Sequence, residues 1–323
     1  MKRILVTGAG GFIGHHLAKF LKQKGYWVRG ADIKHPQFEP TIADDFKVLD
    51  LRDLDNCIEA CKGVDWIYNL AADMGGIGYI TVYHAAIARN NALINLNMLE
   101  AARKGNIEKF LFTSSACVYP QYLQDKADVK PLKEEDAYPA LAEPGYGWEK
   151  LFGELACQYY MEDFGLKTYT VRFHNIFGPL GAYDGGREKS PAAICRKIAL
   201  ARQKDEIEVW GDGKQTRSYC YIDDCVEGIY RLMQSDFHKP INLGQDRMIA
   251  IDELVDMIAN IAGKKINKRY DLAKPQGVRG RNADVALIKK VLNWKARVSL
   301  EQGLEMTYKW IYEQLVKAGR INK

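Results

Sequence analysis

A glycine-rich segment directly after the first hydrophobic run constrains the fold of this chain more than any other feature. Residues 3–7 have the pattern of a buried parallel strand, glycines follow at positions 8, 11 and 14, and residues 15–25 have the pattern of an amphipathic helix. Glycines in this context let the backbone approach a pyrophosphate, and the helix N-terminus supplies N–H donors. The sequence therefore predicts a dinucleotide site formed by Gly8, Gly11, Phe12, Ile13 and Gly14.

Strand and helix patterns continue to alternate after this motif, which predicts a doubly wound parallel sheet, that is, a Rossmann fold of the α/β class. Further strands are expected at residues 27–32, 46–50, 66–70, 109–113 and 167–172, and C-terminal helices near residues 252–263, 284–292 and 300–318. We expect a cofactor-binding domain at residues 1–173, rejoined by about residues 218–245. A smaller C-terminal α/β substrate domain would comprise residues 174–217 and 246–323.

Composition and charge exclude several functional classes. The chain of 323 residues carries a net charge of +5, with basic side chains spread along it, which argues against a nucleic-acid partner and suits a small anionic substrate. No apolar run is long enough for a membrane span. Residues 1–3 lead directly into the first strand, so we expect no secretory segment and a cytoplasmic protein with reduced cysteines. Cys57 and Cys61 are expected to pack in the core, because no further metal ligands lie nearby.

Two aspartates at predicted strand ends complete the cofactor site. Asp32 ends the second strand, 24 residues after Gly8. A carboxylate there accepts hydrogen bonds from the adenosine ribose and repels a 2′-phosphate, so the sequence favours NAD over NADP. Asp50 ends the third strand, where it is either an adenine contact or a cap for a helix that begins with residues 51–53.

Tyr146 and Lys150 stand four residues apart in a predicted helix, hence on one face of it. The ammonium would lower the pKa of the phenol, so that the tyrosinate acts as general base toward an alcohol. Lys150 would also hold the nicotinamide ribose, and Ser115 would donate to the same alcohol oxygen. A lone cysteine such as Cys117 is usually buried packing. Here, however, a thiol replaces the usual hydroxyl or carboxylate, which suggests a second task of moving a proton on and off carbon.

The chain resembles the extended short-chain dehydrogenase/reductase family over essentially its whole length. The segments that carry the resemblance are residues 71–76, 114–120, 146–150, 172–179, 185–189, 210–218 and 277–282. Within that family, two runs are similar to the members that invert two carbons of GDP-mannose. These runs are Ala-Asp-Met-Gly-Gly at residues 72–76 and Gly-Gly-Arg-Glu-Lys at residues 185–189.

The resemblance implies an isomerase that acts on a GDP-sugar and keeps NAD bound through turnover. Tyr146 with NAD would oxidise C4 of the mannose ring, and the resulting ketone would make the C3 and C5 protons acidic. Cys117 and Lys189 would then remove and return these protons from opposite faces, giving GDP-L-galactose, with GDP-L-gulose as a further candidate product. A nearby cationic lysine would lower the pKa of the thiol, and burial would lower the pKa of Lys189.

The resemblance also implies a set of substrate contacts. Asn175 and Gln215 would hydrogen-bond sugar or phosphate oxygens, and Arg279 is favoured for the diphosphate. His174 is expected to be a packed histidine rather than an acid or base. The complete set of expected substrate residues is Gly75, Ser115, Cys117, Asn175, Glu188, Lys189, Lys197, Gln215, Arg217, Arg279 and Arg281.

Three other functions use parts of the same pattern. A nucleotide-sugar 4-epimerase would need the tyrosine and lysine but not Cys117 and Lys189. A 4,6-dehydratase usually carries Asp-Glu where this chain has Ala-Cys at residues 116–117, so the acid that expels water is missing. A non-catalytic NAD-binding relative would be expected to lose Tyr146 or Lys150, and both are present.

The assembly and one long polar segment are less constrained by the sequence. The family commonly forms homodimers through helices that flank the sheet, one of which carries Tyr146, and we expect the same here. Amphipathic helices fit core packing equally well. The segment of residues 121–138 is polar and charged, which suits a mobile flap, and the sequence leaves open whether it orders on binding.

Overall fold

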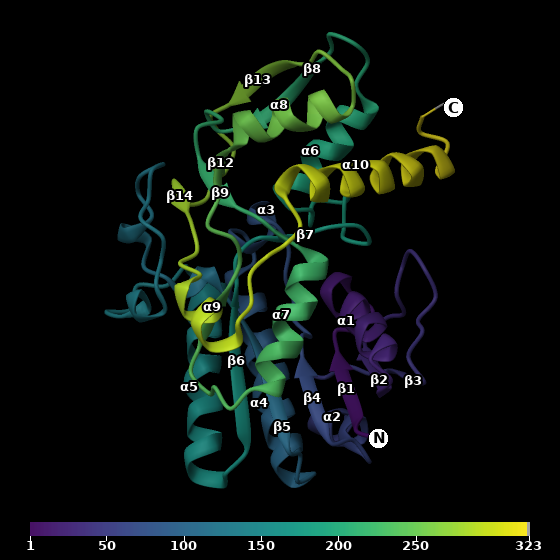
Figure 1. Cartoon of the computed structure of the whole chain (residues 1–323), viewed down its shortest axis with the longest axis vertical. Coiled ribbons are helices and arrows are strands. Elements are labelled where there is room, and N and C mark those ends of the chain that lie inside the picture. The colour runs from purple at the N-terminus through teal and green to yellow at the C-terminus, as the bar shows by residue number, and fades with distance from the viewer. Residues whose placement is uncertain (322–323) are drawn as a thin grey trace.

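Seven parallel strands form the main sheet of the computed structural model, which describes residues 1–321 (Figure 1). Their order across the sheet is β11-β6-β5-β4-β1-β2-β3. The strands are β1 (Arg3–Thr7), β2 (Trp27–Asp32), β3 (Asp45–Val48), β4 (Trp66–Asn69), β5 (Lys109–Ser115), β6 (Lys167–Phe173) and β11 (Ile241–Leu243). The predicted parallel sheet is confirmed. Its strand order reverses between β1 and β4, and ligands of doubly wound sheets bind beyond the carboxyl ends of the strands at such a point.

Helices cover both faces of this sheet because its strands are apolar on both sides. In β1, Ile4 and Val6 face the side of α1 (Phe12–Gln23) and α7 (Ile222–Gln234). Leu5 faces the opposite side, which is covered by three helices. These are α2 (Leu54–Cys61), α4 (His84–Lys104) and α5 (Tyr146–Phe164).

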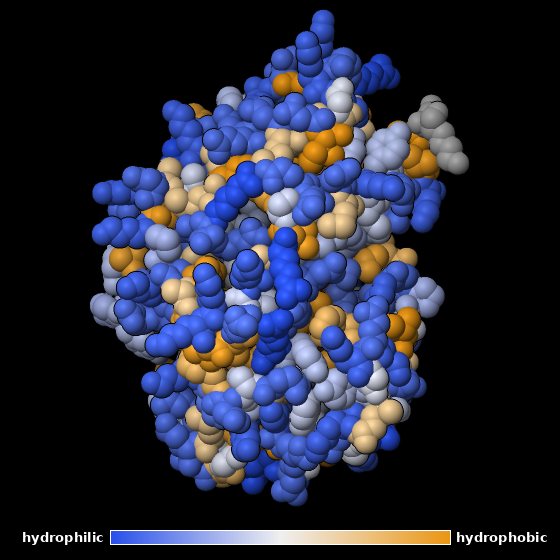
Figure 2. Space-filling view, viewed as in Figure 1, coloured by the Kyte–Doolittle hydropathy of each residue, from blue (hydrophilic) through white to orange (hydrophobic). Residues whose placement is uncertain are grey.

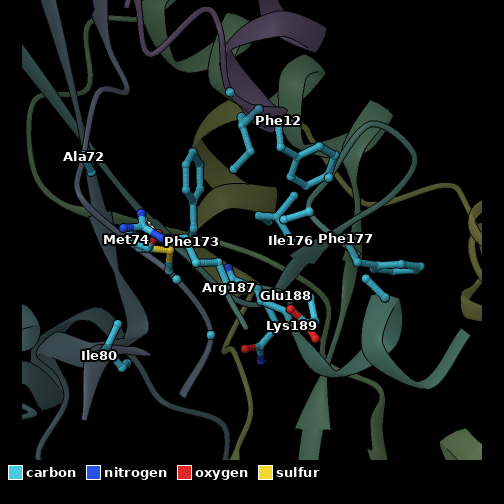
Figure 3. Close-up of a pocket in the computed structure, with 18 of the residues that line it drawn as sticks. Phe12, Ala72, Met74, Ile80, Phe173, Ile176, Phe177, Arg187, Glu188 and Lys189 are labelled. Atoms are coloured by element: carbon cyan, nitrogen blue, oxygen red, sulfur yellow. Dashed lines mark hydrogen bonds between the residues drawn. The ribbon is translucent and has the colours of Figure 1, made fainter. Parts of the chain in front are cut away.

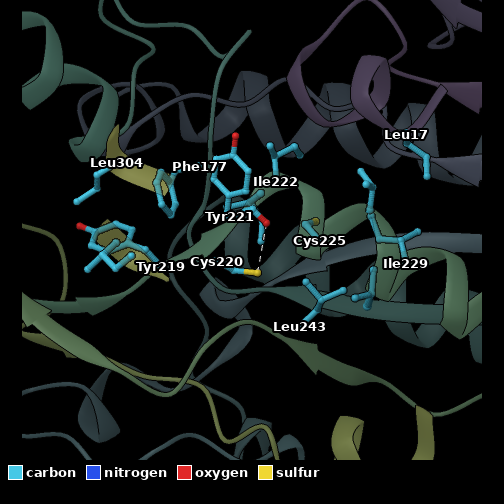
Figure 4. Close-up of a cluster of buried hydrophobic side chains, with 14 of the residues drawn as sticks. Leu17, Phe177, Tyr219, Cys220, Tyr221, Ile222, Cys225, Ile229, Leu243 and Leu304 are labelled. Carbon is cyan, nitrogen blue, oxygen red and sulfur yellow. Dashed lines mark hydrogen bonds between the residues drawn. The ribbon is translucent and has the colours of Figure 1, made fainter. Parts of the chain in front are cut away.

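A smaller lobe sits over the carboxyl ends of the strands (Figure 1). Its helices are α6 (Ser190–Leu200), α8 (Ile251–Ile261) and α10 (Leu300–Lys317), with α9 (Ala286–Leu292) nearer the main sheet. Its strands are β7 (Ile176–Phe177), β8 (Glu206–Trp210), β9 (Thr216–Ser218), β10 (Cys220–Tyr221), β12 (Met248–Ala250), β13 (Asn267–Asp271) and β14 (Gly280–Arg281). Figure 4 shows one hydrophobic cluster that runs from Leu17 of α1 to Leu304 of α10, so the lobe shares its core with the sheet.

The chain returns to the main sheet late in the sequence. After α7, β11 pairs with β6 at the edge of the sheet, with Ile241 opposite Val171. This pairing agrees with the expected return at about residues 218–245, and the domain boundaries themselves stay a prediction. The three C-terminal helices lie where the sequence predicts them.

The polar segment of residues 121–138 contains the short turns η2 (Gln121–Leu123) and η3 (Glu134–Ala137) and is anchored to the body of the protein. The side chain of Leu132 is buried, and its backbone N–H donates to the carbonyl of Asn282 at 3.0 Å. The guanidinium of Arg172 donates to the carbonyl of Glu134 at 2.7 Å. These contacts join the segment to the body of the protein, and its motion as a flap stays a prediction.

The cysteines are buried free thiols, so the expectation that Cys57 and Cys61 pack in the core is confirmed. Within residues 1–321, no cluster of three or more His, Cys, Asp and Glu side chains could hold a metal ion. In the same part of the chain, no helix has the length and apolar character that crossing a membrane requires. The face seen in Figure 2 is mostly hydrophilic, with hydrophobic side chains in small groups.

Candidate active site

One cavity of about 1110 Å³ lies between the carboxyl ends of the main sheet and the smaller lobe. Figure 3 shows part of its wall, with Phe12 from α1 and a run of charged residues that ends at Lys189. Every predicted site residue except Arg279 lines this cavity. These are Gly8, Gly11, Phe12, Ile13, Gly14, Asp32, Asp50, Gly75, Ser115, Cys117, Tyr146, Lys150, Asn175, Glu188, Lys189, Lys197, Gln215, Arg217 and Arg281.

The glycine motif forms a cradle at one end of the cavity. A Cβ atom on Gly14 would lie 2.2 Å from the carbonyl oxygen of Gly8, and one on Gly10 would lie 2.1 Å from the carbonyl oxygen of Lys34. Both contacts are too short for any other residue. Gly11 precedes α1 without a side-chain cap, so the N–H groups of the first turn remain available at the cavity. The cradle fits the pyrophosphate of a dinucleotide.

Asp32 stands beside this cradle at the end of β2. Its carboxylate accepts hydrogen bonds from the backbone N–H of Gly10 at 3.0 Å and of Lys34 at 3.2 Å. Burial raises the pKa of Asp32, and these hydrogen bonds oppose the rise. The carboxylate is fixed at the place where a dinucleotide presents its ribose hydroxyls.

Asp50 also reaches the cavity, but it does not cap a helix. Asp53 is the N-cap of α2, since its side chain accepts from the N–H groups of Asp55 and Asn56. The helix-cap interpretation of Asp50 is therefore wrong. Its carboxylate instead pairs with the guanidinium of Arg52, with Nη2 to Oδ2 at 2.6 Å, which lowers the pKa of Asp50. Its role as an adenine contact stays a prediction.

Tyr146 is the first residue of α5, and Lys150 lies one turn further on. The ammonium of Lys150 is 5.5 Å from the centre of the Tyr146 ring. Burial raises the pKa of Tyr146 well above its usual range, with smaller contributions in the same direction from Cys117 and Glu149, while a hydrogen bond with Ser115 lowers it. The expectation that the phenol pKa is lowered is wrong for this structure, because loss of solvent outweighs the charge of the nearby lysine.

Cys117 lies in the short turn η1 (Ala116–Val118) that follows β5, and its thiol is buried. The guanidinium of Arg281 donates to Sγ from Nη1 at 3.5 Å. Burial raises the pKa of Cys117 to about 11, and the charge of Glu143 adds to this effect, whereas Arg281 opposes it. The expected lowering of the thiol pKa is therefore wrong: the thiol is protonated at neutral pH.

Glu143 is the site residue that the sequence did not reveal. Its side chain is buried, lines the cavity and lies 3.5 Å from the guanidinium of Arg281, from Oε2 to Nη2. Its backbone N–H donates to the carbonyl of Cys117 at 3.0 Å. The only signal in the sequence is its place three residues before Tyr146, and an exposed glutamate in a loop would look the same. Folding brings it together with Arg281, with which it forms an ion pair, and with the thiol of Cys117.

Lys189 is the N-cap residue of α6 and approaches Cys117 from the smaller lobe. Burial lowers the pKa of Lys189, as expected, while the neighbouring thiols of Cys117 and Cys225 oppose the change. A lowered pKa favours the neutral amine, which can accept a proton. The cavity therefore contains one group able to give a proton and one able to take it.

The two sequence runs singled out above contact each other directly. The backbone N–H of Gly76 donates to the carbonyl of Arg187 at 3.0 Å. A Cβ atom on Gly76 would lie 2.3 Å from the carbonyl oxygen of Glu188, so glycine is required there. The guanidinium of Arg187 donates to the hydroxyl of Tyr79 at 2.8 Å and lies 3.4 Å from Asp73. These contacts hold Lys189 against the loop that carries Gly75.

Cations for a phosphate group are also present. Arg217 lines the cavity, and burial lowers its pKa to about 10, with the charge of Arg281 as a further cause. Its guanidinium donates to the carbonyls of Thr216 and Gln276, and within residues 1–321 it forms no ion pair with a carboxylate. A buried cation without an anion is costly unless a ligand supplies one.

Arg279, which the sequence favoured for the diphosphate, lies elsewhere. It lines a smaller neighbouring pocket, and its guanidinium forms a bidentate pair with Asp212 at 2.7 and 2.9 Å. Lys197 does reach the large cavity, although its ammonium donates to the carbonyl of Glu208 at 2.7 Å. The geometry therefore favours Arg217 over Arg279 as the phosphate ligand.

The remaining predicted residues have clear positions. Asn175 lines the cavity with a φ of 45° and donates to the carbonyl of Ser218 at 2.9 Å. Gln215 donates to the carbonyl of Trp210, and its own buried carbonyl oxygen has no partner in the described chain. His174 is fully buried against Asn242, and burial lowers its pKa to about 3. The interpretation of His174 as a packed histidine is confirmed.

We expect Gly147→Ala to lower the free energy of unfolding by about 1–3 kcal/mol, a typical cost of overpacking. A Cβ atom at this position would lie 2.2 Å from the carbonyl oxygen of Cys117, which belongs to rigid backbone. Urea unfolding followed by circular dichroism would measure the change. Gly181→Ala is the matched control, since its Cβ would make ordinary contacts at 3.5 Å. Equal stability of the two variants would contradict the tight approach of α5 to Cys117.

Known proteins are similar to this chain in sequence and in fold. Residues 4–244 match the model of the NAD dependent epimerase/dehydratase family. The chain belongs to this family. The GDP-mannose 3,5-epimerase of Arabidopsis thaliana is 46% identical over 317 residues, which cover 98% of this chain and 83% of the relative. GDP-mannose 3,5-epimerase 1 of Oryza sativa subsp. japonica matches with the same identity and coverage.

Solved structures of epimerases have the same fold. The UDP-glucuronic acid 4-epimerase of Bacillus cereus, solved with UDP-glucuronic acid and NAD, has a TM-score of 0.81 and 26% identity over 97% of this chain and 99% of its own. The UDP-glucose 4-epimerase of Thermotoga maritima, solved with UDP-glucose, has a TM-score of 0.86 and 24% identity, with 97% and 99% covered. The chain is thus a member of a family of NAD-dependent enzymes, and NAD is the dinucleotide that its glycine cradle and Asp32 fit.

Proposed function

We propose that this protein is a GDP-mannose 3,5-epimerase that produces GDP-L-galactose, with GDP-L-gulose as a candidate second product. One observation carries the proposal: the cavity that contains Tyr146 and Lys150 also contains Cys117 and Lys189. An enzyme that only oxidises and re-reduces C4 has no use for the second pair. The two plant relatives with 46% identity bear the same name.

Tyr146, Lys150 and Ser115, here called the tyrosine site, prepare the sugar for proton exchange. NAD, which the glycine cradle and Asp32 would hold, would supply a hydride acceptor at C4 and later return the hydride. In its deprotonated form, which the positive charge of Lys150 favours, Tyr146 takes the proton of the C4 hydroxyl as the carbonyl forms and gives it back at the end. Ser115 hydrogen-bonds the same oxygen, and Lys150 holds a positive charge beside the phenol. The carbonyl at C4 then acidifies the protons on the carbons at either side.

Cys117 and Lys189 carry out the inversions. The neutral amine of Lys189 takes a proton from carbon, and the electron pair of the C–H bond moves into an enolate with the C4 oxygen. The protonated thiol of Cys117 gives a proton to the other face of that carbon, so the centre inverts and the thiol becomes a thiolate beside Arg281. The thiolate and ammonium then exchange roles for the second centre. The raised pKa of Cys117 and the lowered pKa of Lys189 suit these starting states.

We expect Arg217→Met to raise the KM for GDP-mannose by about 10- to 100-fold, because the substrate would lose a hydrogen bond to a charged group. Arg279→Met should raise it much less, because Arg279 is already paired with Asp212. Steady-state kinetics at a fixed ionic strength would measure both, and the kcat values should change less than the KM values. A larger effect at Arg279 would restore the assignment that the sequence favoured.

Heavy water tests the proposed function directly. The protein is incubated with GDP-mannose in D₂O without added NAD, and the product is examined by NMR. Deuterium at C3 and C5 with inverted centres supports the proposal. Unlabelled product inverted only at C4 would show a nucleotide-sugar 4-epimerase, and no turnover would favour a non-catalytic relative.

We also propose that the protein is a cytoplasmic homodimer. A catalytic thiol requires reducing conditions, and the described cysteines are free thiols.

The outer face of α5 carries Trp148, Phe152 and Tyr159, which are 46%, 50% and 51% exposed. Exposed aromatic side chains on one helix suit an interface between copies. Light scattering should give twice the mass of one chain. For Phe152→Glu, the measured mass should fall to that of a single chain.

A further inference from the structure

Glu149 has a position that the proposed mechanism does not explain. It precedes Lys150 on α5, and the side chains of both residues are only 2% exposed. Oε2 of Glu149 lies 3.8 Å from the ammonium of Lys150 and accepts no hydrogen bond within the described residues. A buried carboxylate destabilises a fold unless charges and hydrogen bonds compensate it. Its presence beside the reactive pair therefore suggests a task.

A chain of hydrogen bonds fixes the other oxygen of this carboxylate. Oε1 accepts from Nδ2 of Asn95 at 2.6 Å, and Oδ1 of Asn95 accepts from Nδ2 of Asn69 at 2.9 Å. Oδ1 of Asn69 accepts from the hydroxyl of Thr7 at 2.8 Å, at the end of β1. The hydroxyl oxygen of Thr7 also accepts from the N–H groups of Leu70 and Ala71 at 3.0 Å. The carboxylate is thus held from the carboxyl edge of the sheet.

We propose that Glu149 is a positioning residue that holds the ammonium of Lys150 and offsets part of its charge at Tyr146. Glu149 is not part of the cavity wall, whereas Tyr146 and Lys150 are, so it acts through them and not on the sugar. The inference rests on the proposed function, since it concerns the proton transfer at C4.

A balanced charge suits a reaction that runs in both directions. The phenol has to take the C4 proton in the first step and give it back in the last. An uncompensated ammonium would favour the tyrosinate, which takes a proton well and returns it poorly. The charge of Glu149 contributes to the raised pKa of Tyr146, after burial and the charge of Cys117. The carboxylate thus keeps the phenol able to act as an acid.

Groups other than Lys150 also influence the pKa values of Glu149 and Tyr146. Burial raises the pKa of Glu149 itself, while the charge of Lys150 and the hydrogen bond from Asn95 oppose the rise. The groups that bear on Tyr146 from other elements are Ser115, Cys117 and Glu143. Because none of them changes when Glu149 is replaced, the effect of one charge can be isolated.

Glu149→Gln tests the proposal, because glutamine keeps an acceptor for Asn95 and removes only the charge. The pH dependence of enzyme-bound NADH formation from GDP-mannose is measured by rapid mixing. We expect the acid limb of this profile to move to lower pH by about one unit, the size of a charge interaction over several ångströms in a protein interior. KM should change little, because Glu149 does not line the cavity. If the acid limb of the pH profile does not move, the proposal is overturned.

Stability supplies a second, independent measurement. Because the pKa of Glu149 is raised in the fold, this group contributes stability at low pH that is lost as the pH rises through its folded value. Glutamine removes this cost at neutral pH, but it leaves the buried ammonium of Lys150 without an anion, so Glu149→Gln should unfold at a lower urea concentration than the parent protein. Equal stability of the variant and the parent protein would show that Glu149 does not compensate the charge of Lys150 and would overturn the proposal.

Controls separate the possible failures. Glu162→Gln removes an exposed carboxylate from the far end of the same helix and should leave the profile unmoved. If Glu149→Gln does not fold, Asn95→Ser removes the donor to Glu149 and should move the acid limb in the same direction. If the parent protein forms no NADH with GDP-mannose, the proposed function fails. If it does and neither variant moves the limb, only the role of Glu149 fails.

Discussion

Replacement of Cys117 by alanine is expected to slow proton exchange at C3 and C5 by about 10³-fold, within the range for loss of a general acid or base. Formation of enzyme-bound NADH should continue, because Tyr146, Lys150 and Ser115 remain in place. The ketone would accumulate on the enzyme, since C4 is oxidised while the centres beside it cannot invert. Deuterium uptake by NMR and absorbance of bound NADH would measure the two steps separately.

The matched control for this substitution is Cys61→Ala. Cys61 is also a buried thiol, but it lies at the end of α2, outside the cavity. Its replacement should leave both measurements unchanged. Deuterium exchange at both carbons in Cys117→Ala, at a rate near that of the parent protein, would exclude the thiol from the reaction. Loss of NADH formation as well would mean that the substitution disturbs the tyrosine site.

Tyr146→Phe is expected to have a broader effect, because the phenol acts before any proton can leave carbon. Removing its hydroxyl should slow NADH formation by about 10²- to 10⁴-fold. Deuterium uptake at C3 and C5 should fall with it, since no ketone forms to acidify those protons. The same NMR and absorbance measurements apply, and both signals should be lost together.

Tyr68→Phe is the control for the loss of a buried hydroxyl. Tyr68 lies fully buried in β4, and its hydroxyl has no hydrogen-bond partner in residues 1–321. Its replacement should leave catalysis intact. If Tyr146→Phe still exchanged deuterium at C3 and C5, the protons would leave without prior oxidation at C4, and the proposed mechanism would be wrong.

Local patterns were sufficient to predict the parallel sheet and the residues at the cofactor and tyrosine ends of the cavity. The glycine motif predicts its own turn, because Gly14 has to approach Gly8 closely wherever a strand leads into such a helix. Tyr146 and Lys150 share a helix face by their spacing alone. These predictions succeed because each depends on residues that are neighbours along the chain or on a geometry that the motif itself requires.

Predictions that depended on distant packing were less successful. Arg279 is a plausible phosphate ligand by charge, but the fold pairs it with Asp212, 67 residues away. Glu143 has no motif of its own and becomes part of the site only when β14 brings Arg281 to Cys117. The pKa values of Cys117 and Tyr146 depend on how much water the completed cavity excludes, and a sequence contains no direct measure of that quantity.

The backbone contact between Gly76 and residues 187–188 has a consequence for engineering and for evolution. Two segments more than a hundred residues apart fit together here, so Gly76 cannot accept a larger residue unless the backbone of residues 187–188 moves. Substitutions in one segment should be inherited together with compensating changes in the other. A chimera that takes Lys189 and its loop from one enzyme should misplace the amine unless the segment around Gly76 is transplanted with it.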